Sequence, residues 1–443
     1  MQVSVESSEG LERRMTVELP AERVTEAMEK RLREIARNAR LDGFRPGKVP
    51  LSVVRKRFGG QVQQEVFGDL VQSSYFEAIS SENLNPAGEP TIEPLEKAPE
   101  EGMGYVAVFE VMPEFELAEL SGAVIRRPVV EVTDADVERM VEKLRKQRTT
   151  WNQVEREARG GDQVDIDFKG YIDDEPFDGG TAEGVPLVLG SGSMIPGFEE
   201  GLIGAKAGEE RTLEVTFPED YRVDSLAGKQ ARFEVRVNSV SEPVVPEVDE
   251  EFARAYGVTE GGVEAFLQEI RSNMERELAD KIHSQLKEQA MDALLAANPI
   301  EVPRTLVKQE AEALQRQTRE NMAQGGQASN LELPLDLFEE QARRRVALGL
   351  IIGEVLRSND IKVDRDRVRE KVEQFAQSYE SPQEVIDYYY ADPKNLGPVE
   401  NVVLEDQVVD WVMEQAKVEE QPASFDEIMN PPPKGEESAA AET

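Results

Sequence analysis

The densest group of residues that could do chemistry is a glycine-rich stretch, residues 188–202, which reads Val-Leu-Gly-Ser-Gly-Ser-Met-Ile-Pro-Gly-Phe-Glu-Glu-Gly-Leu. Closely spaced glycines can cradle a phosphate. In a dinucleotide-binding loop, however, the third glycine comes three residues after the second, and here Gly197 follows Gly192 by five. The acidic residue expected further along such a unit is also absent. We therefore expect these glycines to serve backbone turns and not to bind a nucleotide.

A second stretch is suited to binding. Residues 30–57 carry ten Lys or Arg against two acids, a net charge of +8 in a chain of formal net charge −38. The helix-like pattern breaks at 43–50, a stiff loop that includes Phe44. Basic helix faces are often only solvated, but clustered bases beside an aromatic suit an RNA-rich surface. The ten are Lys30, Arg31, Arg33, Arg37, Arg40, Arg45, Lys48, Arg55, Lys56 and Arg57.

Length and composition bound the class of protein. At 443 residues the chain exceeds one typical core, so two to four domains are expected. The absence of Cys excludes disulfides, and the single His283 does not supply the ligands of a zinc site, so we expect no metal and no cofactor. There is no signal-like start and no apolar run of about 18 residues. We expect a cytoplasmic protein without a membrane partner.

The N-terminal third predicts an α+β domain over residues 1–112. Apolar residues alternate as in strands between 3 and 19 and again over 105–112, and they recur at helical spacing over 24–39 and 62–79. Residues 113–149 are interpreted as a connector that packs with the C-terminal part. Its helix is expected to start at Thr133, which has capping-box spacing to Asp136.

The spacing of apolar residues changes twice in the rest of the chain. Residues 150–245 are strand-rich, with alternation over 164–168 and 231–237, and residues 246–430 are predicted to be helical. The tail, 431–443, is rich in Pro, Glu and Ala and is predicted to be disordered. The expected helices cover 263–291, 304–323, 335–357, 364–379 and 399–416.

The glycine-rich stretch resembles the signature of FKBP-type peptidyl-prolyl isomerases, V-L-G-x-G-x-x-I-P-G-x-E-x-G. Together with Gly43-Phe44-Arg45-x-Gly47-x-x-Pro50 upstream and the helical part downstream, the order of motifs resembles the bacterial trigger factor family over nearly the full length. The resemblance implies a multidomain α+β fold: a ribosome-binding α+β domain, a central FKBP-like domain of sheet plus helix, and an all-α chaperone domain. It also implies a ribosome-associated chaperone that shields nascent chains and isomerises Xaa-Pro bonds.

An apolar pocket suffices for that reaction. Rotation about an Xaa-Pro bond faces a barrier of about 18 to 20 kcal/mol because the twisted amide loses resonance. No proton has to move. Apolar and aromatic walls that exclude water can favour the twisted amide over the planar, better solvated one.

The FKBP resemblance assigns the pocket residue by residue. It implies that the Ile195 backbone N–H holds a substrate carbonyl, that the Tyr221 hydroxyl lies at the rim, and that Asp178 lies near the substrate carbonyl. Val185 stands where many relatives carry an aromatic, so that wall should be smaller. Aromatic residues on alternating strands are ordinarily core, and this alternative stays open for Phe168 and Phe233. The candidate catalytic residues are Phe168, Phe177, Asp178, Met194, Ile195, Phe198, Tyr221 and Phe233.

The same resemblance implies partners. The docking loop would be Gly43, Phe44, Arg45, Pro46, Gly47 and Lys48, with Pro46 where some relatives carry lysine. It would bind the large ribosomal subunit near the exit tunnel, through protein and rRNA, while the helical arms hold nascent and unfolded polypeptides. No membrane and no DNA partner is expected, and the family allows a homodimer off the ribosome.

Two alternatives remain open from the sequence. The chain could be a free FKBP-type isomerase whose flanking domains dimerise or recruit clients, or an RNA-binding regulator. The scarcity of basic residues outside 30–57 argues against the regulator. Apolar residues at helical spacing are more often core than client surface, but they permit a chaperone role. These are Met274, Met291, Met322, Tyr388, Tyr389, Tyr390 and Trp411.

Overall fold

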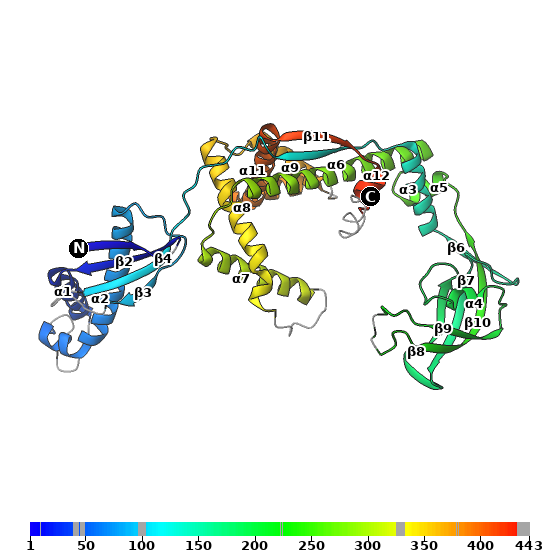
Figure 1. Cartoon of the computed structure of the whole chain (residues 1–443), viewed down its shortest axis with the longest axis horizontal. Coiled ribbons are helices and arrows are strands. Elements are labelled where there is room, and N and C mark those ends of the chain that lie inside the picture. Colours follow the sequence, from blue (N-terminus) through cyan, green and yellow to red (C-terminus); the bar gives the residue numbers. More distant parts are fainter. Residues whose placement is uncertain are drawn as a thin grey trace. The chain divides into compact units, whose positions relative to one another are not determined.

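A computed structural model gives the fold of the chain (Figure 1). It describes residues 1–8, 10–38, 44, 49–95, 103–221, 223, 225–324, 333–377, 379 and 381–431, without the side chain of Asp178. The chain divides into two compact units. The first is Met1–Arg127 with His283–Gln421, and the second is Pro128–Ile282 with Pro422–Thr443.

The first unit begins with a four-stranded antiparallel sheet of order β1-β2-β4-β3. The alternation predicted for the second strand holds, because Met15, Val17 and Leu19 are buried while their neighbours are not. Tyr105 is fully buried on β4, where its hydroxyl lies 2.9 Å from that of Ser74 on α2. The elements are β1 (Gln2–Ser7), β2 (Glu12–Leu19), α1 (Ala21–Asn38), α2 (Leu51–Ser81), β3 (Thr91–Pro94) and β4 (Met103–Glu110).

The remainder of the first unit is mainly helical. Its core includes the fully buried Leu294, Ile351, Val408 and Val412. Strand β5 pairs with β11 in a two-stranded sheet. The elements are β5 (Val124–Val129), α6 (Gly262–Ala297), which continues into the second unit, α7 (Arg304–Gln324), η1 (Leu335–Phe338), α8 (Glu339–Ser358), α9 (Arg365–Ala376), α10 (Pro382–Ala391), α11 (Pro393–Gln415) and β11 (Lys417–Pro422).

The sequence misplaced the start of the last long helix. It was expected at residue 399, but α11 begins at Pro393 and contains Pro398, a residue type that disfavours helix interiors, in its second turn. Pro393 is tolerated in the first turn, and the Asp392 side chain accepts a hydrogen bond from the Lys394 N–H at 3.0 Å, which caps the helix.

The second unit contains a five-stranded antiparallel sheet of order β6-β10-β7-β8, with β9 on β10. On β10 the side chains of Ala231, Phe233, Val235 and Val237 are buried, which confirms the predicted alternation. The elements of this unit are α3 (Asp134–Gln147), β6 (Thr150–Val154), β7 (Gln163–Ile172), β8 (Glu175–Val188), α4 (Phe198–Leu202), β9 (Glu210–Thr216), β10 (Gln230–Val244), α5 (Glu250–Ala255), α6 as far as Ile282, and α12 (Phe425–Met429).

Helix α3 begins with the predicted capping box. The Thr133 side chain accepts from the Asp136 N–H at 3.3 Å, and the Asp136 carboxylate accepts from the Thr133 N–H at 2.8 Å. The buried face of α3 then packs into a second core, whose buried members are Val132, Val137, Val141, Phe252, Ala253, Val258, Phe266, Ile270, Met274, Leu278, Phe425 and Ile428. None of these residues belongs to the core of the five-stranded sheet.

Strands β6 and β10 join the sheet to this helical core. They pair antiparallel from Val240 opposite Val154 to Val244 opposite Thr150. The chain therefore enters and leaves the sheet region through two neighbouring strands. The predicted multidomain α+β fold class is confirmed. None of the described helices has both the length and the apolarity to cross a membrane.

Candidate functional site

A cavity of about 340 Å³ opens beside the five-stranded sheet. It brings together every candidate catalytic residue except Asp178, whose backbone lies in β8 but whose side chain is outside the described part of the structure. The cavity also includes residues that the sequence analysis did not single out, among them Phe217 and Pro218. The lining residues are Phe168, Phe177, Gly179, Ser193, Met194, Ile195, Pro196, Phe198, Phe217, Pro218, Tyr221 and Phe233.

Aromatic rings in edge-to-face contact form much of the cavity wall. The rings of Phe198 and Phe233 lie 5.2 Å apart at 82°, and the rings of Phe168 and Phe198 lie 5.9 Å apart at 79°. Phe198 is 1 % exposed and Phe233 5 % exposed. These two residues therefore belong to the sheet core and line the cavity as well. An aromatic residue in this domain can thus be both a core residue and a pocket residue.

Phe217 extends the aromatic wall toward the rim. Its ring lies 4.7 Å from that of Tyr221 and 5.9 Å from that of Phe177. The alternation of Leu213 and Val215 in β9 continues to Phe217, and this was the signal that could have found it. Val185 packs against the sheet core but is not among the lining residues.

Gly170 on β7 allows two of the rings to approach the sheet. A Cβ atom at this position would lie 2.6 Å from the ring of Phe233 and 2.7 Å from that of Phe177. Such contacts are far inside van der Waals distance, so any larger residue would displace the rings. A glycine within a strand often marks a close approach of this kind, and the sequence analysis did not use that signal.

Glu199 organises the loop that forms one side of the cavity. The residue is 5 % exposed, and its carboxylate accepts hydrogen bonds from the backbone N–H groups of Gly190 (2.7 Å), Gly192 (3.2 Å), Ser193 (2.9 Å) and Met194 (3.1 Å). The Ser191 hydroxyl donates a further bond at 3.1 Å. Burial opposes ionisation, but these donors outweigh it and lower the pKa of Glu199. Sequence reasoning quoted this residue within the signature but gave it no role.

The loop then turns into helix α4. Gly197 adopts a left-handed φ of +89°, and its N–H donates to the Glu200 carboxylate at 2.9 Å. This turn directs Phe198 into the core while Met194 and Ile195 remain half-buried at the cavity. Within the described part of the chain, the Ile195 backbone N–H makes no hydrogen bond, so it is free to meet a ligand.

The predicted ribosome-binding loop is described at one position. Phe44 is 40 % exposed, whereas Gly43, Arg45, Pro46, Gly47 and Lys48 lie outside the described residues. Part of the basic stretch is neutralised locally: Arg31 pairs with Glu34 at 3.0 Å and with Glu65 at 2.5 Å, and Arg33 pairs with Glu29 at 2.7 Å. Among the described bases of this stretch, Arg31 and Arg33 are therefore the ones held by acids.

Comparison with known proteins identifies the family. Models described as "Bacterial trigger factor protein (TF)" and its C-terminus match residues 1–144 and 262–414, and a model of FKBP-type peptidyl-prolyl cis-trans isomerases matches 154–238. Trigger factor of Pseudomonas fluorescens SBW25 is 51 % identical, over 97 % of this chain and 98 % of that protein. Trigger factor of Pseudomonas putida KT2440 is 51 % identical over 100 % of both chains. The chain belongs to the trigger factor family.

Membership confirms the functional prediction. The chain is a ribosome-associated chaperone with an FKBP-type peptidyl-prolyl isomerase domain, and proteins of this family bind the ribosome and nascent chains. A third relative, trigger factor of Alkalilimnicola ehrlichii, is likewise 51 % identical, over 100 % of this chain and 98 % of that protein. The alternatives of a free isomerase and of an RNA-binding regulator are thereby set aside.

Proposed function

We propose that the aromatic cavity beside the five-stranded sheet is where the Xaa-Pro bond is twisted. The observation that carries this proposal is the combination of the aromatic walls with the Ile195 N–H at the cavity, which donates to no described residue. No described lining residue is an acid, a lysine, an arginine or a histidine, so the site is suited to a reaction that moves no proton. The proposed catalytic residues are Phe168, Phe177, Asp178, Met194, Ile195, Phe198, Tyr221 and Phe233.

In this proposal the proline ring enters over Phe198, and the surrounding rings exclude water. The planar amide is thereby deprived of solvation, and the twisted amide, whose carbonyl and nitrogen are decoupled, is favoured. The Ile195 N–H donates to a substrate carbonyl and holds the peptide while the bond rotates. Tyr221 places its hydroxyl at the rim for a second polar contact, and Glu199 keeps the Ile195 loop in position through its bond to Met194.

We further propose a division of labour along the chain. Residues 1–112 bind the ribosome, 113–149 connect, 150–245 isomerise prolyl bonds, and 246–430 hold clients. The predicted tail, 431–443, lies outside the described residues after its first position. The separate cores of the N-terminal sheet, the five-stranded sheet and the helices support this division. The N-terminal domain would dock on the large subunit near the exit tunnel, through protein and rRNA, in the cytoplasm, and the free protein would dimerise.

The docking part of the proposal rests on Phe44 and the bases around it. Changing Phe44 and Arg45 together to Ala should lower the amount of protein that pellets with ribosomes by about tenfold or more. Binding of the unchanged chain should weaken as salt rises, because phosphate contacts release counterions. A matched control changes the exposed Phe67 and Arg14, an aromatic and a base elsewhere in the same domain, and should pellet normally. Equal pelleting of both variants, or binding that ignores salt, would contradict the docking loop.

A further inference from the structure

Segment 156–162 connects β6 to β7 and lies beside both ends of one wall of the proposed prolyl cavity. That wall is formed by residues 190–203, which carry Met194, Ile195 and Phe198. Apart from α4, residues 190–203 contain neither a helix nor a strand. The position of this wall therefore depends on individual hydrogen bonds and not on a strand ladder.

The start of the wall is held by a pair of backbone hydrogen bonds. The Gly161 N–H donates to the Leu189 carbonyl at 2.7 Å, and the Leu189 N–H donates to the Asp162 carbonyl at 2.9 Å. The next residue, Gly190, donates its N–H to the Glu199 carboxylate at 2.7 Å. A displacement of Leu189 would thus reach directly the carboxylate that organises the loop.

The end of the wall is held in the same way. The Ala158 N–H donates to the Ala205 carbonyl at 2.8 Å, and the Gly204 N–H donates to the Ala158 carbonyl at 2.7 Å. Ala158 and Ala205 are 2 % and 0 % exposed, so these bonds lie in the sheet core. Residues 158–162 therefore fix the distance between the two ends of the wall.

Asp162 determines the shape of these residues. It is 3 % exposed, and its carboxylate accepts hydrogen bonds from both terminal nitrogens of Arg156, at 2.5 and 2.9 Å, and from the Arg159 N–H at 2.8 Å. The Asp162 N–H donates in turn to the Arg159 carbonyl at 3.1 Å. Two-point pairing of a guanidinium with a carboxylate is both strong and directional. Without the carboxylate, this turn would lose three of the bonds that hold it.

Arg156 is itself held from a second side. Its guanidinium donates to the Glu242 carboxylate on β10 at 3.1 Å. Glu242 lies opposite Asn152 in the pairing of β10 with β6. The guanidinium therefore bridges this strand pair to Asp162, and the two carboxylates leave it few alternative positions.

We propose that Asp162, oriented by Arg156, is a positioning residue for prolyl isomerisation. Neither side chain lines the cavity, so neither is placed to touch the substrate. By keeping segment 156–162 in one shape, Asp162 fixes both ends of the wall and hence where Met194 and the Ile195 N–H meet the peptide. Catalytic groups lose much of their effect when they are displaced by about 1 Å. The inference rests on the proposed prolyl site and extends it to residues outside the cavity.

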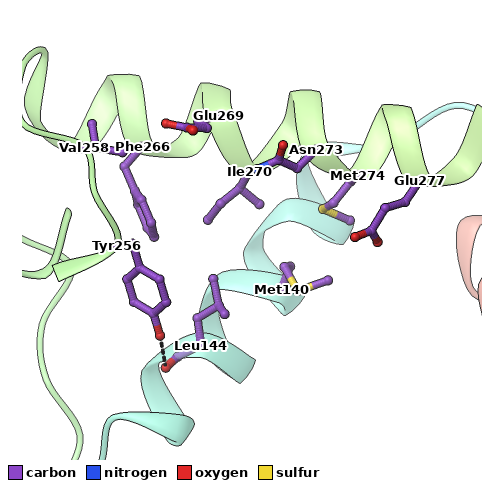
Figure 2. A pocket seen from close by; sticks show the side chains of 10 residues that line it. All are labelled: Met140, Leu144, Tyr256, Val258, Phe266, Glu269, Ile270, Asn273, Met274 and Glu277. Atoms are coloured by element: carbon purple, nitrogen blue, oxygen red, sulfur yellow. Dashed lines mark hydrogen bonds between the residues drawn. The ribbon is translucent and has the colours of Figure 1, made fainter. Parts of the chain in front are cut away.

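A matched control lies in the helical core of the same unit. There Met140 and Leu144 of α3 pack against α6 (Figure 2). Asp136, in the first turn of α3, is 6 % exposed, accepts a hydrogen bond from the Thr133 N–H at 2.8 Å and pairs with Arg139. It has the burial, the backbone donor and the arginine partner of the proposed positioning residue, but it is not part of the five-stranded sheet.

The first test measures kcat/KM for a proline tetrapeptide with the full chain, at a temperature where circular dichroism shows each variant folded. Asp162→Asn should lower kcat/KM about fivefold or more, whereas Asp136→Asn should keep the value of the unchanged chain. Arg156→Lys keeps the charge but loses the two-point pairing, so we expect a loss of about two- to threefold. This milder variant supplies the result if Asp162→Asn does not fold. Unchanged kcat/KM in the Asp162 and Arg156 variants would overturn the proposal.

A double-mutant cycle tests whether the two residues act together. Arg156→Met should lower kcat/KM about threefold or more, and adding Asp162→Asn should bring it no lower than the slower single variant. The reason is that either change alone already removes the same contact. Losses that multiply in the double variant would show independent roles and would contradict the pairing.

The placement of the wall is read by NMR from the Met194 methyl resonance, assigned through Met194→Leu. Asp162→Asn should shift or broaden this resonance, and Asp136→Asn should not. The same reading separates the two proposals. If Met194→Ala and Phe198→Ala both isomerise normally, the proposed prolyl site fails, and the positioning role fails with it. If those variants are slow but Asp162→Asn keeps both the rate and the resonance, only the positioning role of Asp162 is overturned.

Discussion

The carboxylate of Glu199, on helix α4, accepts a hydrogen bond from the backbone N–H of Met194 at 3.1 Å, across the turn at Gly197. Met194 lines the proposed prolyl cavity, whereas Glu199 is buried and is not among the lining residues. A residue outside the cavity lining therefore holds one wall of the cavity in place. Five donors converge on this carboxylate, so its charge is matched by the local backbone and not by a basic side chain.

Changing Glu199 to Gln should impair isomerisation. The amide is neutral, and its NH₂ group would face backbone N–H donors, of which only that of Ser193 has a second acceptor, the Ser191 hydroxyl at 3.3 Å, so the loop should shift. We expect kcat/KM for a proline tetrapeptide to fall about tenfold or more, and the free energy of unfolding to drop by about 1 to 3 kcal/mol. The control is Glu200→Gln, an exposed neighbour that accepts only the Gly197 N–H. Wild-type rate and stability in Glu199→Gln would refute the positioning role.

Stability of the isomerase region should fall in acid. Burial opposes ionisation of Glu199 and Asp162, but hydrogen bonds to their carboxylates outweigh it and lower the folded pKa of both groups. For Asp162 the donors are the Arg156 side chain and the Arg159 N–H. Because the folded pKa lies below the unfolded one, each group stabilises the fold fully above about pH 4.5 and loses that contribution as pH falls through the folded pKa. Urea midpoints measured from pH 6 to pH 3 should show this decline. Glu199→Gln should flatten it, and an unchanged slope would argue against the assignment.

A methyl group at position 170 should disturb the cavity. Gly170→Ala would push against Phe177 and Phe233, so we expect lower stability and at least about tenfold slower isomerisation. Gly160→Ala is the matched control, since a Cβ there meets nothing within 4 Å and the backbone is not left-handed. Near-ultraviolet circular dichroism reports the ring environment. Identical spectra and rates for the two variants would contradict the packing described.

Removing the ring of Phe198, the proposed floor of the cavity, tests whether the reaction takes place there. Phe198→Ala should slow isomerisation strongly but also cost about 3 to 5 kcal/mol of stability, because the ring is 1 % exposed. Met194→Ala, at a half-buried position, should keep the fold and still lower kcat/KM. The exposed Phe76→Ala serves as control. If both lining variants isomerise normally while folded, the reaction takes place elsewhere.

Much of the isomerase region could be predicted from the sequence because its signals are local. Strand alternation placed Val235 and Val237 in the core, and the signature placed Met194, Ile195 and Phe198 together. The part played by Glu199 was not predicted because it depends on a turn that folds its side chain back over a loop. Gly170 was missed because the rings that require it come from residues 177 and 233, which only the folded sheet brings near.

The elements of the helical region were harder to predict from the sequence, for a different physical reason. Helix α10 carries the exposed Tyr388 and Tyr390, at 62 % and 48 %, beside the partly buried Ile386 and Tyr389, so apolar residues lie on both its packed and its exposed face. Strand β11 has a mostly polar and exposed sequence, and it forms because β5 supplies a pairing partner from far along the chain. Propensity and periodicity describe single segments, whereas these two elements depend on their neighbours.

The antiparallel pairing of β6 with β10 has a consequence for how such a chain can evolve. Because both ends of the intervening sheet pass through adjacent strands, a short hairpin turn could replace everything between Val154 and Val240 without reshaping the helical core. The inserted catalytic domain can thus be exchanged as a unit. Evolution can remove, replace or alter it without changing the rest of the fold.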